Sequence, residues 1–317
     1  MMRIFKMRVL PAETIKCTEQ GSVTVTALIV VSVATVLLAG LMWRQQVDVR
    51  ILENARDKIQ AEYLQRAVLD FARLILLEDQ RTSSSDHLGE AWALPLADGK
   101  VADFLKSAEV PDEINKVTLN GQLNDAQGLF NLSNLWDRSI QQANPVGIKI
   151  YERLLEALGL DKGLALLTAQ LVVQRDLPLY DLEGLLKFPG YSPEVIERLR
   201  PFVVILPSAT PINANTAPVE VLMATVTGLS RSAAINFVAQ RSISPPKTLD
   251  ELNTLMGRVA PGGMSIDPTL VDLKSQFWLA RTEIRLGRGI FKQLALIERF
   301  RTPLSNGNFT QVVWSKS

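Results

Sequence analysis

The sequence contains one cysteine, Cys17, and one histidine, His87. A single thiol cannot form an intramolecular disulfide, and neither a Cys-rich zinc site nor a paired-histidine metal motif can be built from this set. The motifs GxxxxGK[ST], HExxH and CxxC are absent as well. The sequence therefore supports no phosphate-binding loop, zinc-protease helix or thiol redox pair.

The chain also lacks an excess of either charge, with 34 Lys and Arg against 33 Asp and Glu among 317 residues. This balance rules out a generally basic nucleic-acid binder. A content of 47% hydrophobic and 21% charged residues is typical of an ordered chain with a packed core. At roughly 100–200 residues per domain, the length allows two compact units.

Glycine and proline are absent from residues 41–88, which overlap the end of an uncharged apolar run at residues 21–43. As a helix, residues 23–43 would span roughly 31 Å, about the thickness of the hydrocarbon core of a bilayer. We therefore predict a transmembrane helix there. A buried core segment and a cleaved secretory signal are the alternatives, but a signal has an apolar core of about 7–15 residues that ends at small side chains, whereas this run ends at Trp43 and Arg44.

Because nothing breaks the helix beyond the membrane, it should continue to about residue 80 and end in the serine-rich segment 82–85. Leu64, Val68, Phe71 and Ile75 recur at helical spacing, and we expect this face to pack on a folded domain. The preceding leader carries a net charge of +2 in residues 1–20, which favours a cytoplasmic N-terminus.

The rest of the sequence has β-prone stretches on either side of a region with helical spacing. Residues 117–122 and 128–132 are short candidate strands, residues 275–285 and 289–299 are longer ones, and residues 309–314 are a candidate third strand of that group. We predict an α+β fold in which an antiparallel sheet packs on the amphipathic helix.

Within the helical region, residues 182–200 and 219–241 share one plan of helix, glycine-containing turn and helix, and residues 248–252 resemble the start of a third unit. This plan resembles the helix-hairpin-helix motif, whose turn amides can hold a nucleic-acid phosphate. A membrane-anchored DNA-binding protein is therefore an alternative function. Since Glu194 and Glu197 interrupt the basic surface of the first unit, a structural or protein-docking role fits better, and we do not expect nucleic acid as a partner.

A basic leader that ends in glycine, followed by an apolar helix that becomes amphipathic, resembles the type IV pilin-like proteins. The resemblance implies that a prepilin peptidase cuts after Gly21 and that Ser22 becomes an N-methylated first residue. Ser22 stands where most pilins have an aromatic residue or Met, and Thr26 stands where most have glutamate. An acidic group at that membrane depth is kept for pairing with a neighbouring subunit, and Thr26 cannot supply that partner.

Three further motifs narrow the resemblance: residues 86–93 (DHLGEAWA), 124–135 (NDAQGLFNLSNL) and 212–217 (INANTA). Together with Thr26 they are similar to the minor pseudopilins of the type II secretion system in the general secretion protein K family. The resemblance implies a leader at residues 1–21 and an N-terminal helix at residues 22–82. It also implies a pilin-like α/β domain at residues 83–131 and 271–317, with a helical domain inserted at residues 132–270.

The family implies assembly rather than catalysis. Its members are expected to cap the tip of the periplasmic pseudopilus with other minor pseudopilins, and to support export of folded proteins across the outer membrane. Further expected partners are the major pseudopilin, the inner-membrane assembly platform and the prepilin peptidase. The chain should cross the inner membrane once, with its N-terminus in the cytoplasm and its C-terminal domain in the periplasm.

Two groups of residues remain as candidates for chemistry. His87 lies next to Ser83, Ser85 and Asp86, so a membrane-anchored hydrolase is another alternative, but adjacent residues do not give the convergent geometry of a triad. We expect a solvated loop histidine and assign no catalytic residue. Calcium, which pseudopilins often bind, is a candidate ion, and turn capping is the alternative role for its candidate ligands. These ligands are Asp125, Gln127, Asn131, Asp267 and Asp272.

Overall fold

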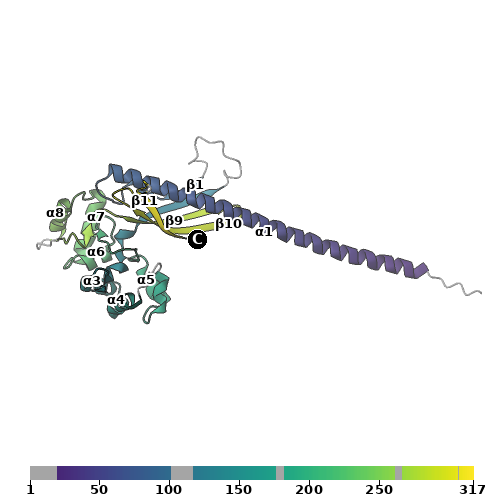
Figure 1. Cartoon of the computed structure of the whole chain (residues 1–317), viewed down its shortest axis with the longest axis horizontal. Helices are drawn as coiled ribbons and strands as arrows, with labels where there is room; N and C mark the ends of the chain where they lie inside the picture. Colours follow the sequence, from purple (N-terminus) through teal and green to yellow (C-terminus); the bar gives the residue numbers. More distant parts are fainter. Residues whose placement is uncertain (1–19, 101–116, 176–181, 261–265, 306) are drawn as a thin grey trace, which may run out of the picture. The chain divides into compact units, whose positions relative to one another are not determined.

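The computed structural model describes residues 20–100, 117–175, 182–260, 266–305 and 307–317 (Figure 1). Most of the predicted leader, residues 1–19, lies outside the described residues. The chain divides into two units, Met1–Asp57 and Lys58–Ser317. Helix α1, Gln20–Thr82, contributes to both. The helix ends at Thr82, in the serine-rich segment 82–85 where its end was predicted, so that prediction is confirmed.

In the first unit, α1 exposes every side chain of residues 23–50. The hydroxyl groups of Ser32 and Thr35 donate to the carbonyl oxygens of Leu28 and Val31, each at 2.7 Å. These polar groups are thus satisfied within the helix, as a lipid environment requires. Among the described residues, α1 alone is long and apolar enough to cross a membrane, and it fits a single-pass anchor.

The second unit contains a five-stranded antiparallel sheet with the order β1-β2-β9-β10-β11. The predicted strands at residues 117–122, 275–285, 289–299 and 309–314 are confirmed. Gly287, with a φ of 58°, allows the tight turn between β9 and β10. The strands are β1 Leu96–Lys100, β2 Thr118–Asp125, β9 Phe277–Leu286, β10 Gly289–Arg299 and β11 Thr310–Lys316.

The predicted strand at residues 128–132 is wrong in extent. Only β3, Phe130–Asn131, is extended, and it pairs in parallel with β6, Val203–Val204, outside the main sheet. The side chains of Asp125 and Asn131 each accept a backbone N–H two residues further on, which favours turns over a longer ladder. These turns are the 3-10 helices η3, Ala126–Gly128, and η4, Leu132–Leu135.

The second half of α1 packs on one face of the sheet (Figure 1). Leu64, Val68 and Ile75 contact this core as predicted. Phe71 does not belong to it, since 46% of its surface is exposed. The most buried residues of the helix recur every three or four positions, in keeping with 3.6 residues per turn. They form a line next to the predicted line of Leu64, Val68, Phe71 and Ile75. The most buried line comprises Ala61, Gln65, Leu69, Ala72 and Leu76.

The residues between the two parts of the sheet form a second core, whose buried members run from Phe130 to Leu273. This core covers nearly the same residues as the predicted insertion at 132–270. Its helices gather together, apart from the five-stranded sheet (Figure 1). They are α3 Pro145–Ala157, α4 Gly163–Arg175, α5 Pro193–Leu199, α6 Val219–Thr225, α7 Arg231–Ile243 and α8 Leu249–Val259.

The predicted helix-hairpin-helix repeat is not confirmed. Helices α6 and α7 do form a hairpin around Gly228, which has a φ of 82°. The predicted repeat at residues 182–200 instead opens with a 3-10 segment, η5 Leu182–Lys187, before α5. Residues 248–252, the predicted start of a third repeat, provide the N-cap and first turn of α8. Short strands complete the fold: β4 Trp136–Asp137 pairs with β5 Gln142–Ala143, and β7 Ile212–Asn213 pairs in parallel with β8 Val271–Asp272.

Candidate functional site

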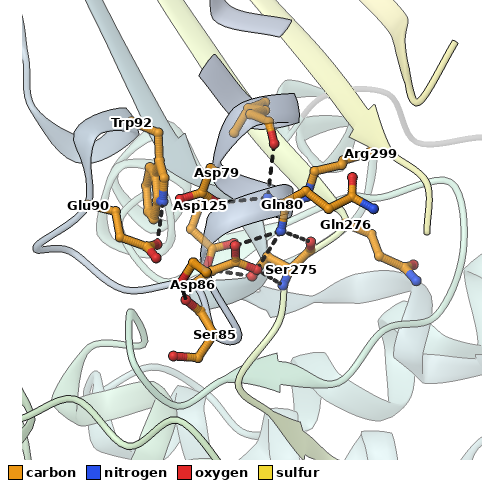
Figure 2. A network of polar contacts seen from close by, with 12 residues as sticks. Asp79, Gln80, Ser85, Asp86, Glu90, Trp92, Asp125, Ser275, Gln276 and Arg299 are labelled. Atoms are coloured by element: carbon orange, nitrogen blue, oxygen red, sulfur yellow. Dashed lines mark hydrogen bonds and ion pairs between the residues drawn. The ribbon is translucent and has the colours of Figure 1, made fainter. Parts of the chain in front are cut away.

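The three motifs DHLGEAWA, NDAQGLFNLSNL and INANTA meet in one buried cluster of polar side chains, most of which are drawn in Figure 2. The first motif contributes residues from the segment after α1, the second from the end of β2 and the third from β7. Arg299, at the end of β10, completes the cluster. We call it the polar junction: Asp79, Asp86, Glu90, Asp125, Asn213, Thr216, Ser275 and Arg299.

Arg299 is the cation of the polar junction. Its Nη2 donates to both carboxylate oxygens of Asp86 at 2.6 and 2.7 Å, and its Nη1 donates to Asp79 at 2.8 Å. Its guanidinium carbon also lies 4.2 Å from the ring centroid of Trp278. The side chains of Arg299, Asp79 and Asp86 are only 5%, 9% and 3% exposed. Both ion pairs are therefore shielded from water, and removing either partner would strongly destabilise the fold.

Glu90 is the third carboxylate near this guanidinium. Its Oε2 accepts hydrogen bonds from Trp92 Nε1 at 2.7 Å and from the backbone N–H of His87 at 2.9 Å. Burial, and then the charge of Glu90, raise the pKa of Asp79 to about 7, against the hydrogen bond from Arg299. With one guanidinium for three carboxylates, the cluster favours a proton on Asp79 near neutral pH.

Asp125 ties the helical core to the sheet. Its Oδ2 accepts from Asn213 Nδ2 at 2.8 Å, Ser275 Oγ at 2.7 Å and Thr216 Oγ1 at 2.6 Å. Its Oδ1 accepts the backbone N–H of Gln127 at 2.8 Å. Burial raises the pKa of Asp125 to about 6, although the bonds from Thr216 and Ser275 lower it. One carboxylate thus holds three separate segments in register.

Asn213 extends the network to the segment after α1. Its Nδ2 lies 3.0 Å from the carbonyl oxygen of Asp86 and 3.0 Å from Ser275 Oγ. The backbone N–H of Ser275 donates to Asp86 at 2.6 Å. The parallel pair β7 and β8 positions Asn213 for these contacts. The end of α1, the sheet and the helical core therefore share one hydrogen-bonded network.

Three of the residues predicted to bind calcium use their oxygens in this region as hydrogen-bond acceptors. Besides Asp125, Gln127 Oε1 accepts a backbone N–H at 2.6 Å, and Asn131 Oδ1 accepts two backbone N–H groups at 3.0 and 3.1 Å. A calcium ion needs about 6–8 oxygen ligands, and N–H groups directed at these oxygens would repel it. Asp125, Gln127 and Asn131 therefore do not fit a calcium ion in this arrangement.

Asp267 and Asp272 act as local acceptors. Asp267 Oδ1 accepts the backbone N–H and the hydroxyl of Thr269 at 2.8 and 2.6 Å, and Asp272 accepts the backbone N–H of Leu273 at 2.7 Å. The bonds to Asp267 are those of turn capping, the alternative role considered for these residues. Calcium binding at this pair stays a prediction.

His87 does not form a catalytic triad. Its Nδ1 accepts the backbone N–H of Gly89 at 3.1 Å, and its Nε2 lies 3.8 Å from Glu90 Oε1. Ser83 Oγ donates to the backbone carbonyl of Ser85 at 2.6 Å, away from the imidazole. The His87 side chain is 23% exposed, so it is less solvated than predicted, and the hydrolase alternative has no geometric support.

The residues predicted to direct processing lie at the start of α1. Gly21 and Ser22 belong to its first turn. Thr26 is exposed and its hydroxyl donates to the carbonyl oxygen of Val23 at 3.1 Å, within the helix. Cleavage after Gly21 and methylation of Ser22 stay predictions.

Sequence reasoning did not single out Asp79 and Arg299, because they are 220 residues apart and lie in no motif. Ser275 also lies in no motif. A signal for the remaining members was available, because the three motifs contain Asp86, Glu90, Asp125, Asn213 and Thr216. Among the described residues, Asp79, Asp86 and Glu90 also form a carboxylate group compact enough for a metal ion, with ligand atoms within 4.8 Å of one another. Arg299 already supplies the positive charge to two of them.

Comparisons with known proteins agree with the motifs and the fold. The family model for type II secretion system (T2SS), protein K, matches residues 212–266, which begin with the INANTA motif. Type II secretion system protein K from Pseudomonas aeruginosa is 30% identical over 239 residues, which cover 65% of this chain and 68% of that protein. The chain belongs to the type II secretion system protein K family. It is thus related to a structural component of a secretion system, and this relation supports neither the DNA-binding nor the hydrolase alternative.

A solved structure supports the fold of this chain. One chain in the crystal structure of the GspK-GspI-GspJ complex from the type 2 secretion system of enterotoxigenic Escherichia coli matches with a TM-score of 0.59 and 17% identity. The match covers 83% of this chain and 98% of that chain. The fold that contains the polar junction is therefore similar to that of a solved structure.

Proposed function

We propose that this chain caps the tip of the periplasmic pseudopilus and thereby supports export of folded proteins across the outer membrane. The polar junction carries the proposal, because it fixes a helical domain, residues 132–270, to a pilin-like body made of residues 83–131 and 271–317. A bulky domain held by the hydrogen bonds of Asn213 and Thr216 to Asp86 and Asp125 would not swing aside. It would obstruct the addition of a further subunit above it.

Thr26 supports the same position in the filament. A subunit with an acidic group at this depth pairs with a neighbour in the membrane, and Thr26, whose hydroxyl bonds within its own helix, cannot replace that group. A chain without this pairing partner is suited to the end of the assembly rather than to its repeating shaft.

Other minor pseudopilins are the proposed partners. The matching solved structure comes from a complex named GspK-GspI-GspJ, which supports an assembly of this kind. The major pseudopilin, the inner-membrane assembly platform and the prepilin peptidase follow from the family. The chain acts by assembly rather than by catalysis, so His87→Ala should leave secretion unchanged.

A crosslinking experiment tests the position at the tip. A photo-crosslinking residue replaces Ile243, which is 83% exposed on α7, and in a second chain it replaces Leu74, which is 62% exposed on α1. We expect Leu74 to crosslink to other pseudopilins through the helix bundle, whereas Ile243 should not crosslink to the major pseudopilin. Equal crosslinking of both positions to the major pseudopilin would mean that the chain lies along the shaft, and would refute tip capping.

Processing and orientation are part of the proposal. The basic leader favours a cytoplasmic N-terminus, so the domain after α1 would lie in the periplasm. The prepilin peptidase would remove the leader on the cytoplasmic side and leave a chain that begins at Ser22. Mass spectrometry of the chain extracted from membranes should find a methylated Ser22 as the first residue. In a Gly21→Ala variant the leader should remain. A wild-type chain that begins near Arg44 and stays soluble without detergent would exclude filament membership.

A further inference from the structure

The sheet face turned away from α1 is covered over only part of its length. Near the helical core, Phe277 and Leu279 on β9 and Leu296 on β10 pack with Leu206. Side chains alternate along a strand, so Arg281 and later odd-numbered residues of β9 lie on this same face. They are exposed or half-buried. The far half of this face is therefore open among the described residues.

A groove of about 740 Å³ lies over this open half. Its lining combines the sheet with one residue of the helical core, Arg200. Its charged side chains are Arg200, Arg281, Glu283, Lys292 and Lys316, and Gln122 is one of its polar side chains.

The groove is strongly basic. Its lining contains four cationic side chains and one acidic side chain, Glu283. Arg200 is neutralised by Glu183 and Glu197, each at 2.8 Å. On the strands themselves, Glu283 lies 3.0 Å from Arg285 and 3.6 Å from Lys292, so the three cations Arg281, Arg285 and Lys292 share one acidic side chain. The whole chain has a net charge of only +1. The positive charge is therefore a local feature of this face rather than a consequence of composition.

Apolar side chains lie between these cations. Leu294 is directly opposite Arg281 on one side and Lys316 on the other. Ile290 is opposite Arg285 and is 59% exposed. Lys292, between them on β10, has a side chain that is 75% exposed and lies 3.6 Å from Glu283. The face thus alternates cationic and apolar surface at the spacing of a strand.

We propose that this sheet face binds an acidic, amphipathic segment of another protein. Carboxylates of that segment contact Arg281 and Lys292, and its apolar side chains lie on Leu294 and Ile290. A nucleic acid or a lipid headgroup would use the cations through phosphate alone and would leave both apolar side chains unpaired. The surface does not depend on the position of the chain in the filament, so its test is independent of tip capping.

The test uses the full chain in a neutral detergent and a fluorescein-labelled peptide of alternating Glu and Leu. We expect anisotropy to report binding that weakens as salt is raised from about 50 to about 300 mM, because screening shortens the reach of surface charges. Arg281→Glu together with Lys292→Glu should weaken binding at least about tenfold. A peptide with Gln in place of Glu should bind at least about tenfold more weakly to the wild type.

Lys149→Glu together with Arg258→Glu is the matched control, since both side chains are exposed on helices of the helical core and the change in charge is identical. Circular dichroism confirms that both double variants are folded. Equal loss of binding in the two double variants would show a general charge effect and would overturn the proposal. The proposal would also be overturned if a DNA duplex or glycerol 1-phosphate displaced the labelled peptide at the same concentrations as the unlabelled acidic peptide does.

Discussion

Arg299 contacts both carboxylate oxygens of Asp86, at 2.6 and 2.7 Å, although 213 residues separate the two positions. The contact joins the end of strand β10 to the segment that follows α1. It is nearly excluded from water, and the same guanidinium holds Asp79 in the last turns of α1. The pair therefore fixes the end of the long helix to the sheet.

Arg299→Met should lower the free energy of unfolding by about 3–5 kcal/mol, because it leaves buried carboxylates without their cation. Urea unfolding of the full chain in detergent, followed by tryptophan fluorescence, measures this loss. Arg301→Met is the control: its side chain is 71% exposed and lies 3.7 Å from Asp272, so the loss should be about 0–1 kcal/mol. Equal losses in both variants would contradict a structural role for the buried pair.

The stability of the second unit should fall as pH rises toward 8. The pKa of Asp79 is about 7 in the folded chain against an ordinary value of 3.8, so the folded state binds this proton more tightly than the unfolded state. The contribution is complete below about pH 4 and is lost as pH rises through about 7. Asp125, with a pKa of about 6, acts in the same direction.

Melting temperatures measured from pH 5 to pH 8 check this dependence. Asp79→Asn should reduce the slope, because an amide cannot lose the proton, and Asp79→Asn with Asp125→Asn should reduce it further. Asp70→Asn, a change of the same kind at a side chain that is 67% exposed, should keep the wild-type slope. A wild-type melting temperature that rises over this range would show that other groups dominate.

Asp125→Ala should loosen the attachment of the helical core. The change leaves the buried donors of Asn213 and Ser275 and the half-buried hydroxyl of Thr216 without this acceptor, at a cost of about 1–3 kcal/mol for an unsatisfied group. Hydrogen exchange measured by mass spectrometry should then be faster in residues 212–217 than in the wild type. Asp137→Ala removes an exposed acceptor of Ser139 and should leave exchange in that segment unchanged.

Gly147→Ala should destabilise the helical core by about 1–3 kcal/mol, the typical cost of overpacking. A Cβ at this buried position in α3 would lie 2.1 Å from the backbone oxygen of Asn134, so the helix must move. Gly257→Ala in α8 meets nothing within 4 Å and should stabilise by about 0.5–1 kcal/mol. Thermal unfolding that ranks the two variants in the opposite order would argue against this packing of α3.

Local chemistry made much of the fold predictable. The strands of the C-terminal hairpin follow from β-branched and aromatic residues around Gly287, and the end of α1 follows from the serine-rich segment. The prediction was wrong at residues 128–132, because Asp125 and Asn131 cap turns through their side chains, a competition that strand propensity does not include. Phe71 was wrongly predicted to lie on the buried face of α1. The spacing of apolar residues does not fix which line of a helix is buried most deeply when the surface it packs on is unknown.

The candidate site was predictable in part. Asp86, Glu90, Asp125 and Asn213 belong to the three motifs that carry the family resemblance. Nothing in the motifs indicated that these side chains lie in one hydrogen-bonded cluster. Arg299 and Asp79 were missed, since a single Arg or Asp in a strand or helix has the same local pattern whether it is buried or solvated.

The sequence by itself determined the apolar length of α1, the family and the order of sheet and helical segments, because these depend on patterns within short stretches of chain. Only the tertiary structure decided that three distant motifs share one buried carboxylate and guanidinium network, and that one half of a sheet face is basic and open. Burial and charge pairing arise from residues brought together across more than 200 positions, and no local pattern encodes them.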